Sequence, residues 1–439
     1  MKRICIIGGG ASGMAAAIAA ARKGAKVTVL EHKDRLGKKI LSTGNGRCNL
    51  TNEFLPEGCY RGEDETFASE VLKLFTPADA ISFFESIGIL TKSRDGYIYP
   101  RNGQAACVRD SLEKEMERCG VKWYVNTEVE SIHPDKGGFR IEVQRRIEDS
   151  SRVTECFPGS KKGRKQGKKQ EKIFRILPET YRADIVILAA GGQAAPVLGS
   201  DGSGYKLAQS LGHSLTLVVP ALVQLRAEDS CFKQLAGVRA DAGVKLYVDD
   251  EWKASDVGEV QLTDYGISGI PVFQVSRYAA FGIACEQRVR AEIDFLPYVT
   301  DTEFLKLLKN RGHQWQDSPV EDLINGIFHS KLLPVLLERA GISCGTPARN
   351  VQDETWKSLV EICKKFQVKI VGTNSFEQAQ VCAGGVRTSE VDAFSMASRI
   401  CNGLYLTGEL LDVDGICGGY NLQWAWATGV IAGEHAALR

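Results

Sequence analysis

Residues 2–31 read KRICIIGGGASGMAAAIAAARKGAKVTVLE, and this stretch decides the fold. Its first part, KRICIIG, is a short apolar run with β-branched residues, which predicts a buried parallel strand. The glycines that follow predict a turn, and the alanine-rich segment after them predicts a helix that Gly24 ends. A second apolar run, AKVTVLE, ends on Glu31. The order strand, helix, strand predicts a βαβ unit.

Three glycines in this unit match the pattern G-x-G-x-x-G, directly after a strand and at the start of a helix. Gly8 permits a tight turn, Gly10 lets a pyrophosphate approach the backbone, and Gly13 lets the helix pack closely on the sheet. The N–H groups at the helix N-terminus favour phosphate. Glu31 stands where a carboxylate accepts hydrogen bonds from ribose hydroxyls, and its charge disfavours the 2′-phosphate of NADP. Together these features predict a dinucleotide site.

The composition narrows the class of protein. A chain of 439 residues is too long for one compact core, so two or three domains are expected. The 55 basic and 54 acidic residues nearly cancel, which disfavours nucleic acid and membrane as partners. The 13 cysteines include no C-x-x-C pair, so they predict reduced thiols in a cytoplasmic protein rather than a zinc ribbon. No metal cluster is expected among the six histidines.

Two uncharged segments, 4–21 and 415–433, are long enough to resemble membrane spans. Glycine clusters interrupt both, and the second contains Asn421 and Gln423, so neither is interpreted as a targeting or membrane segment.

Three further glycine-rich stretches favour FAD over NAD. The loop STGNGRCNLTN at 42–52 would let the backbone approach a planar ring and offers donors to its carbonyl groups. Near the C-terminus, a strand leads to Gly408-Glu409, and Gly418-Gly419 opens a helix whose N-terminus suits the negative charge of a reduced flavin. A third glycine turn follows a strand at 189–192. We expect these stretches to converge on one flavin.

The order of elements predicts an α/β protein with one doubly wound, Rossmann-type domain made from both chain ends. The expected divisions are a first FAD-binding part at 1–193, with helices over 64–91 and a small antiparallel sheet at about 121–182, a β-rich insert at 194–298, a helical insert at 299–366, and a second FAD-binding part at 367–439. The segment 160–172 carries seven basic residues against one acidic residue, as expected of a solvated hairpin tip or of a site for an anionic partner such as RNA.

The chain resembles the BaiN/RdsA family of FAD-dependent oxidoreductases, flavoproteins that include bile-acid-pathway reductases and aminoacetone oxidases. The resemblance spans residues 4–433 and rests on IIGGGASGMAAAIAA, LGKKILSTGNGRCNLTN, LAAGGQAAPVLGSDGSGYKLAQSLGH, LTDYGISGIPVFQVSR and the stretch from AGGVRTSE to GGYNLQWAWATGVIAG. It implies a two-dinucleotide-type flavoprotein fold with a β-rich, barrel-like and helical insertion over the flavin. Cys417 departs from the family pattern, in which threonine is usual, and 160–172 lies outside the shared motifs.

The resemblance also implies which residues lie on or near FAD. The predicted cofactor-binding set is Gly8, Gly10, Ala11, Ser12, Gly13, Glu31, His32, Lys38, Lys39, Ser42, Thr43, Gly44, Arg47, Cys48, Asn49, Val129, Ala190, Gly191, Gly192, Gly408, Glu409, Asp412, Gly419, Tyr420, Asn421, Leu422 and Gln423.

Cys48 raises the question of a reactive thiol. Disulfide reductases with this fold carry a C-x-x-x-x-C pair at a comparable point, whereas the next cysteine here, Cys59, is eleven residues away. Arg47 could lower the pKa of Cys48, but that alone does not make a redox centre. We therefore expect Cys48 to pack against the flavin rather than to react.

The sequence favours an FAD-dependent oxidoreductase that takes electrons from NAD(P)H and reduces a small organic acceptor such as a conjugated enone through flavin N5. No second G-x-G-x-x-G follows a strand, so nicotinamide is expected to bind transiently at the flavin face. The alternatives are an amine oxidase that uses oxygen and a flavoprotein that acts on tRNA. The substrate, the oligomeric state and the catalytic residues stay open, with candidate proton donors at Tyr97, Tyr99, Tyr265 and Tyr420.

Overall fold

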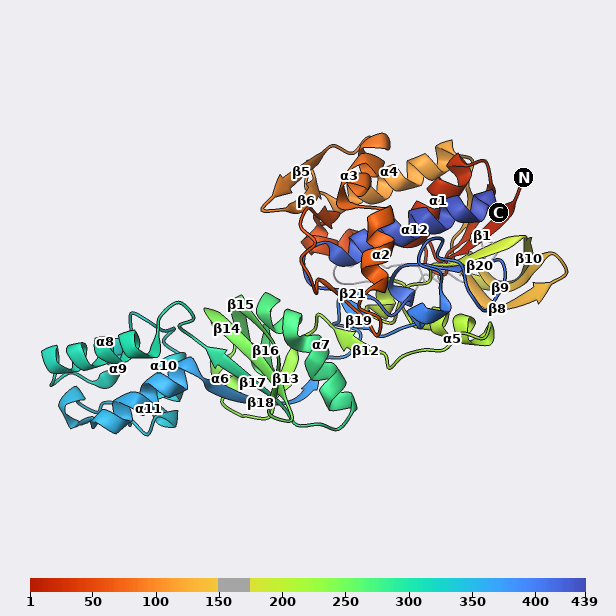
Figure 1. Ribbon diagram of the computed structural model, residues 1–439. Helices are drawn as coiled ribbons and strands as arrows, with labels where there is room; N and C mark the ends of the chain where they lie inside the picture. Colours follow the sequence, from red (N-terminus) through yellow and green to blue (C-terminus); the bar gives the residue numbers. More distant parts are fainter. Residues whose placement is uncertain (149–173) are drawn as a thin grey trace, which may run out of the picture.

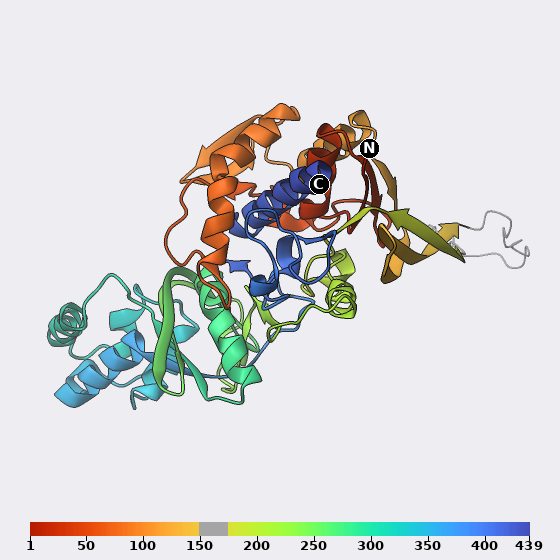
Figure 2. The same cartoon turned by 45° about the vertical axis from the view of Figure 1, so that its right-hand side comes forward.

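The computed structural model describes residues 1–148 and 174–439, so the basic segment 160–172 lies outside the described residues. The molecule has two parts, which Figures 1 and 2 show from two directions. One part contains both chain termini, which lie near each other, and the other contains the barrel and a group of helices (Figure 1).

A five-stranded parallel sheet forms the centre of the first part. Its order is β20 (Leu404–Leu406), β11 (Ile185–Leu188), β1 (Arg3–Ile7), β2 (Lys26–Leu30) and β7 (Lys122–Tyr124). The apolar run in β1 is buried from Ile4 to Ile7, as a strand covered on both faces requires. Strands from the two chain ends therefore lie in one Rossmann-type sheet, which confirms the predicted fold class.

Two helices from opposite chain ends, α1 (Ala11–Arg22) and α12 (Tyr420–Leu438), pack side by side (Figure 1). Their contact depends on small residues. A Cβ on Gly429 would lie 2.4 Å from the Ser12 carbonyl oxygen, and one on Gly433 would lie 2.3 Å from that of Ala16. The alanines of α1 and the glycines of α12 thus allow two backbones to approach within distances that larger residues forbid.

The predicted helical region 64–91 consists of two helices, α2 (Phe67–Leu74) and α3 (Pro77–Ser86). The break has a local cause. The Thr76 side chain accepts a hydrogen bond from the Asp79 N–H while the Asp79 carboxylate accepts from Thr76, and Pro77 occupies the first turn. A further helix, α4 (Ala105–Arg118), follows the hairpin β5 (Thr91–Arg94) and β6 (Tyr97–Pro100), with β3 (Thr51–Asn52) paired to β6.

The predicted antiparallel sheet contains β8 (Thr127–Asp135), β9 (Gly138–Glu148) and β10 (Phe174–Ala183) in the order β10-β9-β8. The predicted bounds of this sheet were about 121–182, but β7 pairs with β2 in the parallel sheet instead. Asn126 explains the division, because its left-handed conformation (φ 53°) turns the chain between β7 and β8. The antiparallel sheet extends from the side of the first part opposite the barrel (Figures 1 and 2).

The second part contains a closed antiparallel barrel. Its strands, in spatial order, are β13 (Leu225–Ala227), β16 (Gly266–Gly269), β15 (Glu251–Thr263), β14 (Arg239–Val248), β17 (Val289–Asp294) and β18 (Phe366–Thr373). The short helix α6 (Phe232–Leu235) lies before β14, and the long helix α7 (Ile270–Ala284) packs along β15 and β14.

Four helices, α8 (Asp301–Gln314), α9 (Val320–Ile324), α10 (Leu332–Arg339) and α11 (Asp353–Lys364), extend the barrel away from the first part (Figure 1). Their apolar faces share one hydrophobic core with the barrel strands. Since β18 closes the barrel after these helices, we propose that residues 225–373 form a single unit rather than two inserts that end at residue 366.

The remaining elements are shorter. They are the pairs β4 (Tyr60–Arg61) with β21 (Asp414–Gly415) and β12 (Val219–Ala221) with β19 (Val381–Ala383), the helix α5 (Ser203–Ser210), and the 3-10 turns Ile40–Gly46, Pro196–Leu198, Ala348–Asn350, Thr388–Glu390 and Gly408–Leu410. Within residues 1–148 and 174–439, no helix has the length and hydropathy that a membrane crossing needs.

Candidate functional site

The N-terminus of α1 opens onto a large cleft. A Cβ on Gly8 would lie 2.4 Å from the Ala189 carbonyl oxygen, and one on Gly13 would lie 2.0 Å from that of Gly8, so both glycines pack against backbone. Gly10 differs, because a Cβ there would meet no atom within 4 Å. Gly10 is the N-cap of α1, and within residues 1–148 and 174–439 no side chain caps this helix. The N–H groups at the start of α1 therefore face open space at Gly10, which is where a phosphate group would bind.

Glu31 follows β2 at the edge of the same cleft. Its Oε2 accepts a hydrogen bond from the Gly9 N–H at 2.7 Å, and its Oε1 accepts from the Lys33 N–H at 2.8 Å. The next residue, His32, places Nδ1 3.6 Å from Asp201 Oδ2, and its buried Nε2 has no hydrogen-bond partner among the described residues. The carboxylate is thus held by backbone donors beside a ring nitrogen that is available to a ligand.

The loop after Lys39 crosses the cleft in an unusual conformation. Gly44, Asn45, Gly46 and Cys48 all have positive φ, of 53°, 53°, 81° and 57°. Left-handed residues other than glycine are strained, and strain of this kind gathers at ligand sites. The glycines and the asparagine of STGNGRC therefore allow the sharp turns of a backbone segment that lines the cleft.

Cys48 itself faces away from the cleft. Its side chain is fully buried, and burial raises the pKa of its thiol to about 12. A thiol with this pKa stays protonated near neutral pH and is a poor nucleophile. Asn49, the next residue, does line the cleft, and its buried Oδ1 has no hydrogen-bond partner among the described residues.

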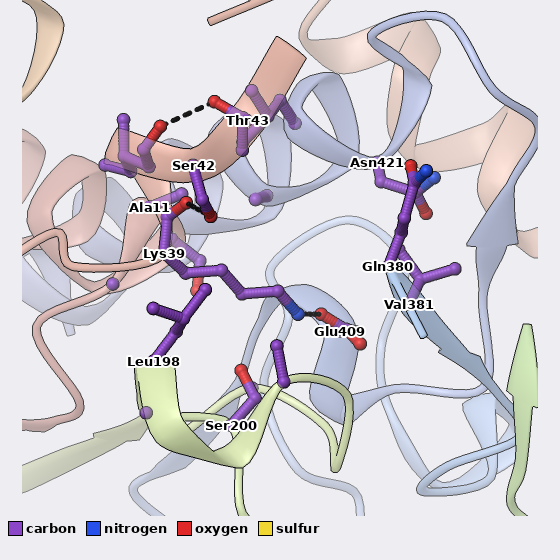
Figure 3. Close-up of a pocket in the computed structure, with 18 of the residues that line it drawn as sticks. Ala11, Lys39, Ser42, Thr43, Leu198, Ser200, Gln380, Val381, Glu409 and Asn421 are labelled. Carbon is purple, nitrogen blue, oxygen red and sulfur yellow. Dashed lines mark hydrogen bonds and ion pairs between the residues drawn. The ribbon is translucent and has the colours of Figure 1, made fainter. Parts of the chain in front are cut away.

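An ion pair joins the two chain ends on the cleft wall. Lys39 Nζ lies 2.9 Å from Glu409 Oε2 and also donates to the Ala194 carbonyl at 3.1 Å. Glu409 Oε1 accepts from the Cys382 N–H at 2.9 Å. Figure 3 shows Lys39 extending from the segment of Ser42 and Thr43 toward Glu409, with Gln380 and Asn421 on the far side. This pair fixes the distance between the loop and the C-terminal segment.

The N-terminus of α12 forms another wall. Gly418 and Gly419 have positive φ, of 130° and 97°, and no side chain of the part that the structure describes caps the 19-residue helix. Asn421 lines the cleft, but its side chain is already engaged, because Nδ2 donates to the Gly415 carbonyl and Oδ1 accepts from the Gly415 N–H, both at 2.8 Å. Asn421 therefore holds the turn in place, and the backbone N–H groups at the start of α12 are the donors that can bind a ligand there.

The barrel supplies a wall that the predicted residue set did not include. A Cβ on Gly258 would lie 3.3 Å from Cγ of Pro271, so β15 contacts the first turn of α7. The residues exposed to the cleft at this contact are Asp256, Val257, Ile270, Phe273 and Gln274. The only sequence signal was the family stretch LTDYGISGIPVFQVSR, in which a glycine and a proline open a helix.

Helix α7 is bound to the segment before α12 by two polar contacts. The Cys417 N–H donates to Gln274 Oε1 at 2.9 Å, and Arg277 Nε lies 2.9 Å from Asp414 Oδ1. Asp414 is 1 % exposed, and burial raises the pKa of its carboxyl to about 6 although Arg277 and Arg61 oppose the rise. The barrel and the FAD-binding part are therefore joined by a buried ion pair next to the cleft.

The cleft has a volume of about 1220 Å³. Drug-sized ligand pockets span about 300–1,000 Å³, so this cleft has room for a dinucleotide and a second molecule. The predicted residues that line it are Gly8, Gly10, Ala11, Ser12, Glu31, His32, Lys38, Lys39, Ser42, Thr43, Gly44, Arg47, Asn49, Val129, Ala190, Gly191, Glu409, Gly419, Asn421 and Leu422.

Seven predicted residues do not line the cleft, namely Gly13, Cys48, Gly192, Gly408, Asp412, Tyr420 and Gln423. Most of them support the wall from behind. A Cβ on Gly192 would lie 3.0 Å from Glu409 Oε1, and one on Gly408 would lie 2.7 Å from Ser12 Oγ. Gln423 is fully buried and donates to the Phe75 carbonyl at 3.0 Å. A sequence motif includes both the residues that line a ligand site and the residues that support them, and does not distinguish the two groups.

The cleft fits FAD. The uncapped α1 N-terminus, the space at Gly10, the orphaned polar atoms of His32 and Asn49 and the uncapped α12 N-terminus are distributed around one cavity. Of the four tyrosines considered as proton donors, Tyr97 and Tyr99 line it, whereas Tyr265 and Tyr420 do not. In the part of the chain that the structure describes, no group of His, Cys, Asp and Glu side chains could hold a metal ion.

Comparisons with known proteins give consistent matches. The family described as "HI0933-like protein Rossmann domain" matches residues 2–159 and 159–435. A 3-dehydro-bile acid delta(4,6)-reductase of Clostridium scindens is 48% identical over 441 residues, which cover 100% of both chains. A ribosomal RNA dihydrouridine synthase of Escherichia coli is 27% identical, over 96% of this chain and 95% of that protein.

Among solved structures, a 3-ketosteroid-delta4-(5alpha)-dehydrogenase from Rhodococcus jostii RHA1 superposes with a TM-score of 0.45 at 16% identity, over 99% of this chain and 97% of that one.

Proposed function

Because the chain belongs to the family of the HI0933-like Rossmann domain, we propose that it is an FAD-dependent oxidoreductase that reduces a carbon–carbon double bond conjugated with a carbonyl group, with electrons from NAD(P)H. The observation that carries this proposal is the 48% identity, over the whole length of both chains, with a reductase named for a 3-dehydro bile acid. We take a flat, mostly apolar molecule with a conjugated enone as the substrate class.

The residues of the first part would hold the cofactor. The α1 N-terminus suits the pyrophosphate, and Glu31 beside it suits a ribose. The strained loop around Asn49 and the α12 N-terminus suit the flavin ring, since free N–H groups stabilise negative charge that develops there. When bound, FAD supplies hydride transfer through N5.

The residues of the barrel wall would hold the substrate. Val257 and Ile270 are 48% and 61% exposed, although both are apolar and face the cleft. Exposed apolar side chains at a cavity rim favour an apolar ligand. In this proposal the residues from the two chain ends bind the cofactor, and the residues of the barrel bind the substrate. NAD(P)H then binds transiently in the same cleft, because the sequence has no second dinucleotide motif after a strand.

The two half-reactions test this proposal separately. The purified protein should carry FAD and absorb near ~450 nm. Under anaerobic conditions NADH or NADPH should bleach this band, and a 3-oxo-Δ4,6 bile acid should restore it with formation of the reduced acid. Bleaching by aminoacetone, with recovery by oxygen and not by the enone, would contradict the reductase and favour the amine oxidase.

A second candidate rests on the 27% identity with the ribosomal RNA dihydrouridine synthase. Reduction of the uracil ring is the same class of reaction, since its double bond is also conjugated with a carbonyl group. If reduced protein converts uridine in ribosomal RNA to dihydrouridine while the bile acid leaves the flavin reduced, the substrate is RNA and the small-molecule assignment is wrong.

A further inference from the structure

Asp256 is the acidic residue of the barrel wall of the cleft. It lies on β15, opposite Val244 of β14, and next to Val257 at the contact between β15 and α7. Because Gly258 touches Pro271, the Asp256 side of the strand is held beside Phe273 and Gln274 in the first turn of α7. The carboxyl group is therefore placed by packing between a strand and a helix rather than by a mobile loop.

The carboxyl group of Asp256 is half-buried, and no lysine, arginine or histidine among the described residues neutralises it. Burial raises the pKa of Asp256, and only a backbone hydrogen bond from Val257 opposes the rise. None of the lysine, arginine and histidine side chains of the described residues contributes to that balance. An aspartic acid in such surroundings holds a proton more readily than an ordinary surface aspartate.

Asp256 also faces the segment that leads into α12. Both Asp256 and Cys417 line the cleft. Burial raises the pKa of the Cys417 thiol to about 12, and the charge of Asp256 adds to this rise. Cys417 directly precedes Gly418-Gly419 at the start of α12, and its N–H is bound by Gln274. Asp256 thus lines the same cleft as the turn where the flavin ring is proposed to lie and as the apolar residues Val257 and Ile270.

On the premise of the proposed enone reduction, we propose that Asp256 is the catalytic acid that protonates the substrate at the carbon α to its carbonyl group. Hydride from the reduced cofactor adds to the β carbon and leaves an enolate. The Asp256 O–H bond then breaks as a C–H bond forms at the α carbon from the enolate electron pair. Water returns a proton to the carboxylate, so each turnover consumes one hydride and one proton.

Tyr97 is the rival donor. It lies on β6 and approaches the same turn from the other side, since a Cβ on Gly418 would be 2.9 Å from Tyr97 Cε1. Its phenol hydroxyl can donate a hydrogen bond to the carbonyl oxygen of an enone. We therefore assign Tyr97 to that hydrogen bond, and the Tyr97→Phe variant separates this role from proton transfer to carbon.

The test separates proton transfer from cofactor and substrate binding. Wild type, Asp256→Asn, Tyr97→Phe and Asp241→Asn are purified with FAD, reduced with dithionite and mixed anaerobically with a 3-oxo-Δ4,6 bile acid in a stopped-flow instrument. Asp241 is the matched control, because it is exposed on the neighbouring strand β14 and lies outside the cleft. Flavin reoxidation by the enone should slow about 10²–10⁴-fold in Asp256→Asn and stay unchanged in Asp241→Asn.

Two further readouts exclude a structural effect. The FAD content of Asp256→Asn and its reoxidation by ferricyanide, which needs no proton on substrate carbon, should match wild type, and Asp256→Glu should recover part of the rate with enone. Enone reoxidation at the wild-type rate in Asp256→Asn would overturn the assignment, as would a loss confined to Tyr97→Phe. If the enone fails to reoxidise wild-type flavin, the proposed function itself is wrong.

Discussion

The two walls of the cleft are built in opposite ways. The wall from the chain ends consists of turns in which backbone touches backbone, so that a Cβ on Gly8 or Gly13 would meet a carbonyl oxygen at 2.4 or 2.0 Å. The wall from the barrel consists of ordinary side chains on β15 and α7, supported by a separate hydrophobic core. The first wall fixes residue identity tightly, whereas the second can change its side chains without a change of fold. This arrangement suits a protein family in which every member binds the same cofactor at the first wall and different members bind different substrates at the second.

This contrast explains which features the sequence predicted. The βαβ unit, the FAD-type glycine turns and the barrel-like insertion were predicted, and the family match and the five-stranded sheet confirm the resemblance and the fold class. Motifs mark the first wall because its backbone geometry needs glycine at fixed spacings. Asp256 and Val257 carry no such mark, since their position in the cleft depends on how a strand and a helix meet in three dimensions.

The same reasoning explains two differences in detail. The motif residues Cys48 and Gln423 are predicted to lie on or near FAD, and both are fully buried and do not line the cleft, because a sequence pattern cannot separate contact from support. The insertion is predicted to end at residue 366, whereas β18 closes the barrel up to Thr373. The sequence predicts a strand after residue 366, but it does not show with which strands that strand pairs.

The largest effect is expected from the first wall. Gly13→Val places side-chain atoms where even a Cβ would lie 2.0 Å from the Gly8 carbonyl oxygen, so the turn must shift. We expect a loss of about 3 kcal/mol in the free energy of unfolding and no bound FAD. Urea denaturation and the absorbance of the flavin measure both. Gly326→Ala is the control, because a Cβ there meets no atom within 4 Å and stability should be retained.

The junction between the walls is the next target. Arg277→Ala leaves Asp414 buried without its cation, which costs about 3 kcal/mol or more in stability at pH 7. The exposed barrel residue Arg288 gives a matched control, since Arg288→Ala removes only surface ion pairs and should cost under about 1 kcal/mol. Equal losses in the two variants would show that the junction is not held by the buried pair.

The pH dependence of the junction has a definite sign. Burial raises the pKa of Asp414 from 3.8 to about 6, so the folded protein binds this proton more tightly than the unfolded chain. The resulting stabilisation is present below pH 4 and is lost as the pH rises to 6. The stability of Asp414→Asn relative to wild type should therefore increase by about 2 kcal/mol from pH 4 to pH 7. A flat difference over this range would refute the assignment.

A smaller effect is expected within the flavin loop. Asn49→Ala removes a buried polar atom that no described residue hydrogen-bonds, and Arg47→Ala removes a donor at the cleft, so each should weaken FAD binding about tenfold. Cys48→Ser should retain FAD and most activity, because the Cys48 thiol is buried and protonated. Titration of apoprotein with FAD, followed by flavin fluorescence, gives the three affinities. If Cys48→Ser retains FAD but loses turnover, Cys48 is a reactive thiol and its assignment as a packing residue is wrong.

The central claim is that the chain ends bind the cofactor and the barrel binds the substrate, and one titration tests it most directly. Ile270 is 61% exposed at the barrel wall, so Ile270→Ser should leave folding intact. Wild type and Ile270→Ser, both loaded with FAD, are titrated with a 3-oxo-Δ4,6 bile acid, and the flavin absorbance reports binding. We predict that the Kd of the bile acid rises about tenfold while the affinity for FAD is unchanged. An unchanged Kd of the bile acid, or a loss of FAD, would contradict the division of the cleft.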